Sequence, residues 1–426
     1  MNRLCFCMFF MMFLLSGSMS CQFYSQSDKQ FMNAERHFKE LESILKHDSA
    51  MLWGINMYGP TMFVDPESRM IVANRQDKNG LLKKNGNVYL GFLPDEYNIA
   101  NTALTFSDEL WTCVSRMDFD NDIERNLLLV HESWHRVQNE IGVLSVMSNN
   151  THLENVEAAI LLKMEMIALN HALMNDGDNN DLVNALTIRM IRQEKYPNNN
   201  EDEYECHEGL AEYTALKVLA NDDKNYILMK AILLNKIENA LGYDTYTHSF
   251  AYVTGPAYGF ILDEISSNWK NDVMSGSTMN DILLNIVDIN TDIDKDAFIS
   301  NLVECYNIEV FINNEYERLT SLKQDANIMR RKFDASPSLY IKNNGVNFTY
   351  NPNERVIPYD NLGNIYKSMR LSGDFGVVET NDGVLVTSDW SYFVLPYNED
   401  NNYHLDLNET YYIKKINKDR FEIISK

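Results

Sequence analysis

The sequence has few basic residues for its length. It holds 37 lysines and arginines against 61 aspartates and glutamates in 426 residues, which gives a net charge of -24. Such a chain is repelled by phosphate backbones, and no basic run offsets the effect, so we expect no nucleic-acid partner. The hydrophobic share of 45% is ordinary for a folded protein and argues against a disordered or fibrous chain.

Cysteine is also too scarce for disulfide bonds to stabilise the fold. Of the 6 cysteines, two lie in an apolar leader and a third directly follows it. The remaining three are Cys113, Cys206 and Cys305. An odd number in a chain of this length predicts no disulfide framework, and the chain is long enough to bury a sizeable core instead.

No apolar run is long enough to span a bilayer. The stretch from Leu4 to Leu15 has about a dozen residues, whereas a membrane helix needs about 20. Because Arg3 precedes this stretch and small residues follow it, we expect residues 1–20 to be a signal peptide.

Cys21 follows the small residues of this leader, in a pattern that resembles a bacterial lipobox. We therefore expect an exported lipoprotein of the bacterial cell envelope, periplasmic or on the outer membrane surface, tethered by a lipid on Cys21. Ser18 stands three places before the cysteine, where an aliphatic residue is usual. Simple secretion is therefore the alternative.

The apolar pattern predicts an α+β protein with β-rich regions on both sides of a helical one. Apolar residues recur at helical spacing in some regions, and short apolar runs alternate with turn signals in others. The expected parts are a helical segment at 21–56, a β-sheet at 57–116, helices at 121–333 and a C-terminal β-rich domain at 339–426. The last part is typical of a small β-sandwich or barrel.

Turn-forming residues predict where some elements end. The stretch KKNGN, residues 83–87, is expected to be a turn of the sheet. A helix is expected over 256–270, with Gly255 and Pro256 at its start. The stretch DASPS, residues 334–338, is expected to be a linker before the C-terminal domain.

The strongest chemical signal is the stretch HESWH, residues 131–135. On a helix, residues four apart share a face, so His131 and His135 can direct their imidazoles at one metal ion. Glu132 lies about 100 degrees round the helix, where it can reach a water at the metal without binding the metal. The alternative is that two histidines happen to share a buried helix.

A metal site also needs a third ligand, and several glutamates are candidates. Gln138 and Ile141 stand where a metzincin would have glycine and histidine, so that class is excluded. The candidates are Glu154, Glu157 and Glu165 on one expected helix, and Glu201, Glu205, Glu208 and Glu212 on another. The second set is spaced by four, three and four, so its carboxylates share one face. A solvated acidic face is the alternative, although the neighbouring Leu210 and Tyr213 indicate partial burial.

Together, HESWH and the later EGLAEY resemble the gluzincin metallopeptidases, which include the thermolysin and aminopeptidase N families. The resemblance covers residues 57–270. It implies a thermolysin-like catalytic region, in which a small mixed β-sheet precedes a helical bundle that carries the HExxH helix. It also implies that Glu208 binds Zn²⁺ together with His131 and His135, and that Glu212 supports a zinc-binding histidine.

The resemblance implies further parts of a peptidase site. The segment YVTGPAYGF is similar to the Y-x-K-G segment of aminopeptidase N-like enzymes. Tyr252 is therefore expected to stabilise the oxyanion, with Tyr258 and His248 as alternatives and a purely structural tyrosine as the other interpretation. The order of elements implies a substrate-pairing strand at Asn101, Thr102 and Ala103. No G-x-M-E-N segment precedes the zinc helix, so an endopeptidase is expected.

The implied function is zinc-dependent hydrolysis of a peptide or protein substrate. Zinc is expected to lower the pKa of a water toward ~7, with Glu132 as the base that takes its proton. One alternative is a non-catalytic, membrane-tethered lipoprotein whose C-terminal β domain binds protein or glycan. The aromatic candidates for that role are Trp390, Tyr392, Phe393 and Tyr397, although alternate aromatics in a strand are more often core. Another alternative keeps zinc but acts on a different amide or ester.

Overall fold

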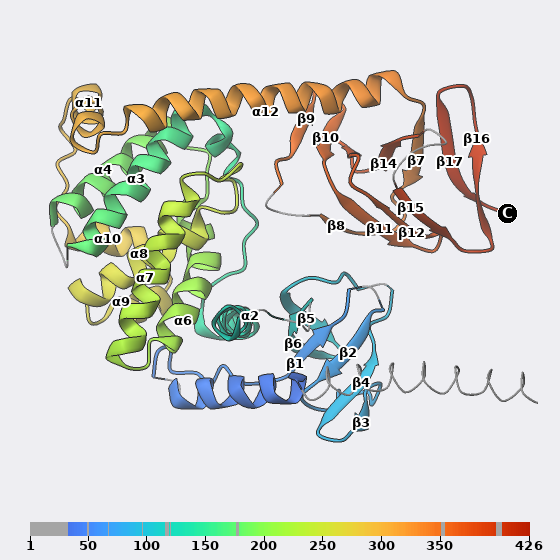
Figure 1. Ribbon diagram of the computed structural model, residues 1–426, viewed down its shortest axis with the longest axis horizontal. Helices are drawn as coiled ribbons and strands as arrows, with labels where there is room; N and C mark the ends of the chain where they lie inside the picture. Colours follow the sequence, from blue (N-terminus) through green and yellow to red (C-terminus); the bar gives the residue numbers. More distant parts are fainter. Residues whose placement is uncertain are drawn as a thin grey trace, which may run out of the picture. The chain divides into compact units, whose positions relative to one another are not determined.

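A computed structural model of the chain combines helices and sheets (Figure 1). Helices make up 48% and strands 21%, which confirms the α+β class. The residues that it describes are 33–48, 51–66, 68–95, 97–115, 119, 121–175, 179–350, 354–397 and 403–426. The expected signal peptide and the lipidation at Cys21 lie outside them. The chain forms two compact units, one up to Pro94 together with Ile99–Val137, the other comprising Asp95–Asn98 and Gln138–Lys426.

A six-stranded sheet forms the centre of the first unit. Its strands are β1 Thr61–Val64, β2 Met70–Ala73, β3 Lys83–Asn85, β4 Val88–Phe92, β5 Thr102–Phe106 and β6 Glu109–Val114. They lie in the order β3-β4-β2-β1-β6-β5, with β1 and β6 parallel and the other neighbours antiparallel. The sheet is therefore mixed, and β5 lies at one of its edges.

The turn expected at residues 83–87 is partly wrong. Lys83–Asn85 pairs with β4 as strand β3, and the turn is confined to Gly86, with φ +59°, and Asn87. All three residues of β3 are exposed, so the strand carries no apolar alternation that would reveal it in the sequence. Glycine adopts the left-handed conformation of such a turn without a steric penalty.

Two helices of the first unit pack on this sheet and on the segment that precedes it. The helix at residues 33–48 stacks Phe38 on Phe63 of β1, with ring centroids 5.1 Å apart. The second helix, α2 Asp122–Ile141, places Trp134 against Trp53, with ring centroids 4.7 Å apart. Arg136 of α2 also donates to the Met57 carbonyl at 2.6 Å. These contacts hold the part of α2 up to Val137 within the first unit.

Helices dominate the first half of the second unit (Figure 1). They are η1 Thr151–Glu154, α3 Val156–Met174, α4 Asn179–Lys195, α5 Glu201–Tyr204, η2 Glu205–Gly209, α6 Leu210–Leu219, α7 Asp223–Ala240, α8 Ala251–Ile265, α9 Trp269–Met274, α10 Met279–Ile286, α11 Lys295–Cys305 and α12 Glu309–Ala335. No described helix combines the length and the apolar character needed to cross a membrane. The three described cysteines, Cys113, Cys206 and Cys305, are free thiols.

The helix expected over residues 256–270 begins earlier and ends earlier. α8 starts at Ala251, contains Pro256 and stops at Ile265, and α9 follows from Trp269. Because proline lacks a backbone N–H, Pro256 removes one hydrogen bond near the start of α8 without ending the helix. The expectation that Gly255 and Pro256 mark the helix start is therefore wrong.

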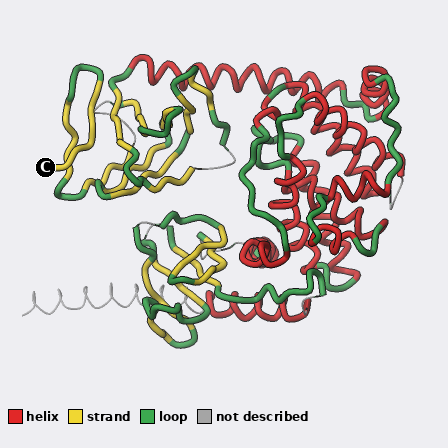
Figure 2. The backbone as a smooth tube through the Cα atoms, turned by 180° about the vertical axis from the view of Figure 1, so that it is seen from behind, coloured by secondary structure: helices red, strands yellow, loops and turns green. Residues whose placement is uncertain are grey.

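The C-terminal part of the second unit is a β-sandwich (Figure 2). One sheet has the order β16-β17-β7-β14-β13-β10-β9 and the other the order β15-β12-β11-β8. The strands are β7 Ser338–Lys342, β8 Asn347–Tyr350, β9 Ile357–Tyr359, β10 Gly363–Tyr366, β11 Met369–Gly373, β12 Gly376–Thr380, β13 Val384–Thr387, β14 Tyr392–Pro396, β15 Tyr403–Leu407, β16 Tyr411–Lys415 and β17 Arg420–Ser425. Buried residues of both sheets, such as Leu371 and Phe393, share one core.

Helix α12 joins the helical region to the sandwich. Its C-terminal half buries Ala326 and Phe333 against Ile365 and Leu385 on the face of the larger sheet opposite the shared core. The helix continues to Ala335 and β7 begins at Ser338, so the linker expected at residues 334–338 shrinks to two residues.

Candidate metal centre

Helix α2 presents two imidazoles on one face. His131 and His135 lie one turn apart, and their Nε2 atoms are 3.1 Å from each other. His131 is buried, and the neighbouring Val130 and Trp134 belong to the hydrophobic core. The rigid helix and the packed side chains beside it hold the two rings together, and these rings are two of the three predicted ligands.

Glu132 follows the first histidine and is also buried, with 5% of its surface exposed. Burial raises the pKa of the Cys113 thiol on β6 to about 12, and the charge of Glu132 adds to that shift. The carboxylate of Glu132 therefore lies close enough to the sheet to act on Cys113. This position between helix and sheet agrees with a carboxylate that is fixed in direction, as a general base needs to be.

The predicted third ligand, Glu208, lies on a π-helical turn of the second unit. This turn, η2, widens the helix that continues from α5 into α6. Its backbone approaches α8 so closely that a Cβ on Gly255 would lie 2.4 Å from the Cα of Gly209. The buried Glu205, the first residue of η2, accepts two hydrogen bonds from Arg189, at 2.8 and 2.7 Å. Both contacts fix the segment that carries Glu208.

The last turn of α2 belongs to the second unit and contacts η2 there. The buried Gln138 side chain donates from Nε2 to Nδ1 of His207 at 3.0 Å. His207 in turn lies beside Glu208, with Nε2 and Oε1 3.4 Å apart. The predicted ligands on α2 stand one and two turns before Gln138 on the same helix.

His131, His135 and Glu208 form a group that could hold a metal ion. Each offers one ligand atom, and these atoms all lie within 4.8 Å of one another. Two ligand atoms that bind one tetrahedral zinc at about 2.0–2.1 Å are roughly 3.3 Å apart. The 3.1 Å between the imidazole nitrogens is close to that value. Two imidazoles and a carboxylate are also a donor set of catalytic zinc, so these residues fit the ion.

The other glutamates of the acidic series have different partners. Glu201 forms an ion pair with Arg192 at 2.5 Å, and Glu205 pairs with Arg189 at 2.7 Å. Glu212, predicted to support a zinc-binding histidine, accepts a hydrogen bond from Lys236 Nζ at 2.5 Å. Three of the four carboxylates on this face, those of Glu201, Glu205 and Glu212, therefore pair with arginine or lysine side chains. Glu208 is the member that joins the histidines.

The first three candidates on the earlier helix are placed elsewhere. Glu165 is fully buried and pairs with Arg189 and Arg192. Glu154 accepts from Thr247 at 3.1 Å and pairs with Arg355 at 3.2 Å. Glu157 pairs with Lys195, and both side chains are half exposed. Among the described residues, none of these three belongs to a group that could hold a metal.

Tyr252, the predicted oxyanion donor, lies in the first turn of α8 and is partly buried. Its ring centroid is 5.9 Å from Lys236 Nζ, the group that also bonds Glu212. The alternative Tyr258 is fully buried and donates to Glu165 at 2.8 Å, which assigns its hydroxyl to the core.

The charge of Glu208 shifts the pKa of two further side chains in the second unit, those of His248 and Tyr204. Burial lowers the pKa of His248, and the carboxylates of Glu208 and Glu154 oppose that shift. Burial raises the pKa of Tyr204, and the charge of Glu208 raises it further. Their rings lie 6.0 Å apart. The sequence offered His248 as an alternative to Tyr252 but did not single out Tyr204, although it stands four residues before Glu208 on the same helical face.

The predicted substrate strand lies at a sheet edge. β5 pairs with β6 alone among the described strands, with Thr102 opposite Cys113 and Ala103 opposite Thr112. Asn101 precedes the strand, and its side-chain oxygen accepts hydrogen bonds from the backbone and hydroxyl of Ser115, each at 2.9 Å. The opposite edge of β5 has the backbone groups that strand addition requires. Its use by a substrate stays a prediction.

No protein-family model, curated protein or solved structure matches the chain. The functional argument therefore depends on the geometry of these residues and on the resemblance of their motifs.

Proposed function

We propose that the protein is a zinc-dependent endopeptidase of the gluzincin type. One observation carries the proposal. His131, His135 and Glu208 each offer a ligand atom within 4.8 Å of the other two, although His135 and Glu208 are 73 residues apart in the sequence. A chance pair of histidines on a helix has no reason to meet a glutamate that follows from so far along the chain. The mixed sheet before the helix and the helices after it support the same proposal, since the gluzincin resemblance implies that order.

Each residue has a distinct task in the proposed reaction. His131, His135 and Glu208 would hold the ion. A bound zinc would polarise the substrate carbonyl and lower the pKa of water in the site toward ~7. Glu132 then takes a proton from the attacking water at its carboxylate and passes it to the leaving amine. Tyr252 is the proposed donor to the oxyanion, and Tyr204 and His248 are the alternatives that the charge of Glu208 indicates.

Exchange of Glu132 for glutamine tests the chemistry. Glu132→Gln keeps the size of the side chain and its polarity but removes the proton acceptor, so peptide hydrolysis should fall by roughly 100- to 10,000-fold. Zinc content should stay unchanged because Glu132 is not a ligand. The measurement is hydrolysis of a quenched fluorescent peptide library, with metal content determined on the same samples. Hydrolysis at the wild-type rate would overturn the mechanism.

Metal analysis tests the ligand set separately. Purified protein should contain one zinc per chain by mass spectrometry, and His131→Ala and Glu208→Ala should each lose it. Glu203→Ala is a matched control, since Glu203 is exposed on the helix that precedes η2. Wild-type protein that takes up no zinc even after incubation with the ion, or a Glu208→Ala variant with full zinc content and affinity, would contradict the proposal.

The same measurements distinguish other hydrolases. If the library is not cleaved but zinc is present, ester and non-peptide amide substrates become the next class to assay, because the motif fixes the metal chemistry and not the substrate. We also propose that the protein is exported and held at a membrane surface by a lipid on Cys21. Intact mass of protein purified from a bacterial envelope, compared with Cys21→Ser, tests that anchor.

A further inference from the structure

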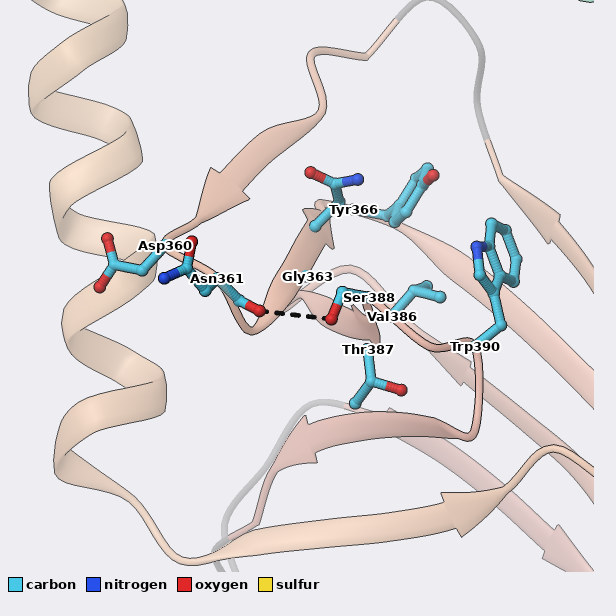
Figure 3. Close-up of a pocket in the computed structure, with 9 residues that line it drawn as sticks. Asp360, Asn361, Gly363, Tyr366, Val386, Thr387, Ser388 and Trp390 are labelled. Carbon is cyan, nitrogen blue, oxygen red and sulfur yellow. Dashed lines mark hydrogen bonds between the residues drawn. The ribbon is translucent and has the colours of Figure 1, made fainter.

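A pocket of about 410 Å³ lies in the C-terminal sandwich (Figure 3). It is lined by residues from the β9–β10 turn, from β10, and from β13 and the turn that follows it. The volume is within the range of small-molecule sites, roughly 300–1,000 Å³. Nothing in the proposed peptidase reaction uses it.

The pocket opens where the two sheets of the sandwich do not match in width. Asn364 on β10 stands opposite Val386 on β13, so the two side chains lie on the same face of the seven-stranded sheet. Val386 is buried in the core shared with the four-stranded sheet, whereas Asn364 is exposed. The inner face of the larger sheet is therefore uncovered at Asn364, and Asn364, Tyr366 and Val386 form a floor there.

Trp390 forms one side of the pocket and has an unusual backbone (Figure 3). Its φ of +58° lies in the left-handed region, which bulky side chains avoid. The turn maintains this conformation, because Asp389 accepts hydrogen bonds from Ser391 and Thr387 and the Trp390 carbonyl accepts one from Asn343 at 2.9 Å. As a result, 48% of the tryptophan surface is exposed. A backbone strain that the surroundings enforce, and that presents a large apolar ring to solvent, is typical of a binding site.

The polar groups of the pocket are neutral and mixed. Ser388 donates its hydroxyl to the Asn361 carbonyl at 3.3 Å on the side away from Trp390 (Figure 3). The Asn364 amide and the Trp390 indole N–H add further donors and acceptors. Among the described lining residues there is no lysine, arginine or histidine, and Asp360 is the only charged one. A phosphate or carboxylate ligand would meet no cation here, and a fully apolar ligand would leave these groups unsatisfied.

We propose that this pocket binds a neutral pyranose sugar, as one residue of a glycan. The apolar C–H face of a pyranose ring can lie against Trp390, while its hydroxyls, each a donor and an acceptor, meet Ser388, Asn364 and the Asn361 carbonyl. The site would hold the protein on a glycan or glycoprotein, apart from the residues that would carry out hydrolysis. It goes beyond the proposed peptidase activity and does not depend on it.

The five tryptophans make the binding measurable. Trp53, Trp111, Trp134 and Trp269 are at most 3% exposed, so acrylamide quenching of the fluorescence reports mainly on Trp390. The methyl glycosides of glucose, galactose, mannose and N-acetylglucosamine are titrated into the full chain, alongside a glycan array. At least one neutral sugar should saturate and lower the quenching constant about two-fold, because a bound ring covers the exposed indole face. No protection by any of these sugars and no glycan bound on the array would overturn the proposal.

Two variants locate the site, with binding measured by calorimetry. Trp390→Ala should weaken sugar binding roughly tenfold, the factor that corresponds to one lost aromatic contact. Asn364→Ala should also weaken sugar binding, and the fold should be kept because Asn364 is an exposed strand position. If Trp390→Ala does not fold, Asn364→Ala alone tests whether the sugar binds in this pocket. Tyr412→Ala is the control, since Tyr412 is 40% exposed on β16 and does not line the pocket.

The outcomes separate this proposal from others. Wild-type affinity in both pocket variants, or binding of a neutral tetrapeptide as tightly as any sugar, would overturn it. Glu132→Gln should bind the sugar as tightly as wild type, so failure of the peptidase proposal leaves this one standing, and the reverse is also true.

Discussion

At the residue scale, two glycines without a Cβ set the position of the proposed third ligand. Gly209 on η2 and Gly255 on α8 meet with their backbones almost in contact. A Cβ on Gly255 would also lie 3.1 Å from the Cγ of Glu205, the residue that Arg189 holds from the other side. Glu208 therefore stands on a turn that is fixed by backbone contact on one side and by a buried ion pair on the other.

Gly255→Ala should disturb both stability and metal binding. The new methyl group would meet backbone atoms that cannot move aside, so we expect a loss of about 1–3 kcal/mol in the free energy of unfolding. Because η2 has to shift, zinc affinity should fall as well. Urea unfolding and competition with a zinc chelator measure the two effects.

Gly242→Ala is the matched control. A Cβ at Gly242 would be 3.6 Å from the Asn239 carbonyl oxygen, an ordinary contact, so stability and zinc affinity should remain near wild type. If the two alanine variants behave alike, the close approach of α8 does not position Glu208.

The residues of the metal cluster could be predicted to different degrees. His131 and His135 are visible from the sequence because four-residue spacing on a helix is a local property. Glu208 could be chosen among seven glutamates only through the resemblance of its motif, since its convergence with α2 depends on tertiary packing. Tyr204 and His248 meet near Glu208 for the same reason, and no spacing in the sequence reports their 6.0 Å ring contact.

At the element scale, a buried network of charges underlies α5 and η2. Arg192 pairs with Glu201 at 2.5 Å and with Glu165 at 2.6 Å, and all three side chains are fully buried. Arg189 links Glu165 and Glu205 in the same way, at 2.9 and 2.7 Å. Glu201 and Glu205 of the acidic run that precedes Glu208 are therefore internal, and their ion pairs tie three helices together.

Glu201→Gln should destabilise the protein and change its response to acid. Burial raises the pKa of Glu201, but the charge of Arg192 and hydrogen bonds from His152 and Arg192 outweigh it, so this pKa lies well below the ordinary 4.5. The unfolded chain then takes up a proton at a higher pH than the folded one, so acid favours unfolding. The stabilisation is complete above pH 4.5 and is lost as the pH falls through the lower folded value.

The free energy of unfolding of Glu201→Gln should be about 3 kcal/mol lower than that of wild type at pH 7, because Arg192 keeps only one of its two carboxylate partners. Between pH 5 and 3 its melting temperature should fall less than that of wild type, since the glutamine does not titrate. Calorimetry across this range provides the measurement. Glu203→Gln, exposed on the same helix, should remain within about 0.5 kcal/mol of wild type. Parallel pH curves for wild type and Glu201→Gln would contradict the assignment.

The strands of the sandwich show which elements a sequence can reveal. Strands such as β13 and β14 consist of continuous apolar runs, VLVT and YFVLP, which predict strands from the sequence. β9 and β15 lack such runs, because each lies at a sheet edge and has few buried side chains. β9 also contains Pro358, which is tolerated at an edge but argues against a strand in the sequence.

At the scale of the whole molecule, α12 is the element that makes one body of the second unit. Its N-terminal half buries Glu315, which pairs with Lys163 of α3 in the helical region. Its C-terminal half buries Phe333 on the sandwich. One more contact joins these parts, an Arg355–Glu154 ion pair at 3.2 Å.

Lys323→Pro tests whether α12 transmits stability between the two parts. Lys323 is exposed between the buried Leu319 and Ala326, so the substitution removes no packing contact. Proline in a helix interior costs about 3 kcal/mol and interrupts the hydrogen-bond ladder at that point. We expect wild type to unfold the helical region and the sandwich together, and the variant to unfold them in two separate calorimetric transitions. Lys323→Ala, which keeps the helix, should retain the single transition. One transition in Lys323→Pro, moved to lower temperature, would instead assign the coupling to the Arg355–Glu154 ion pair.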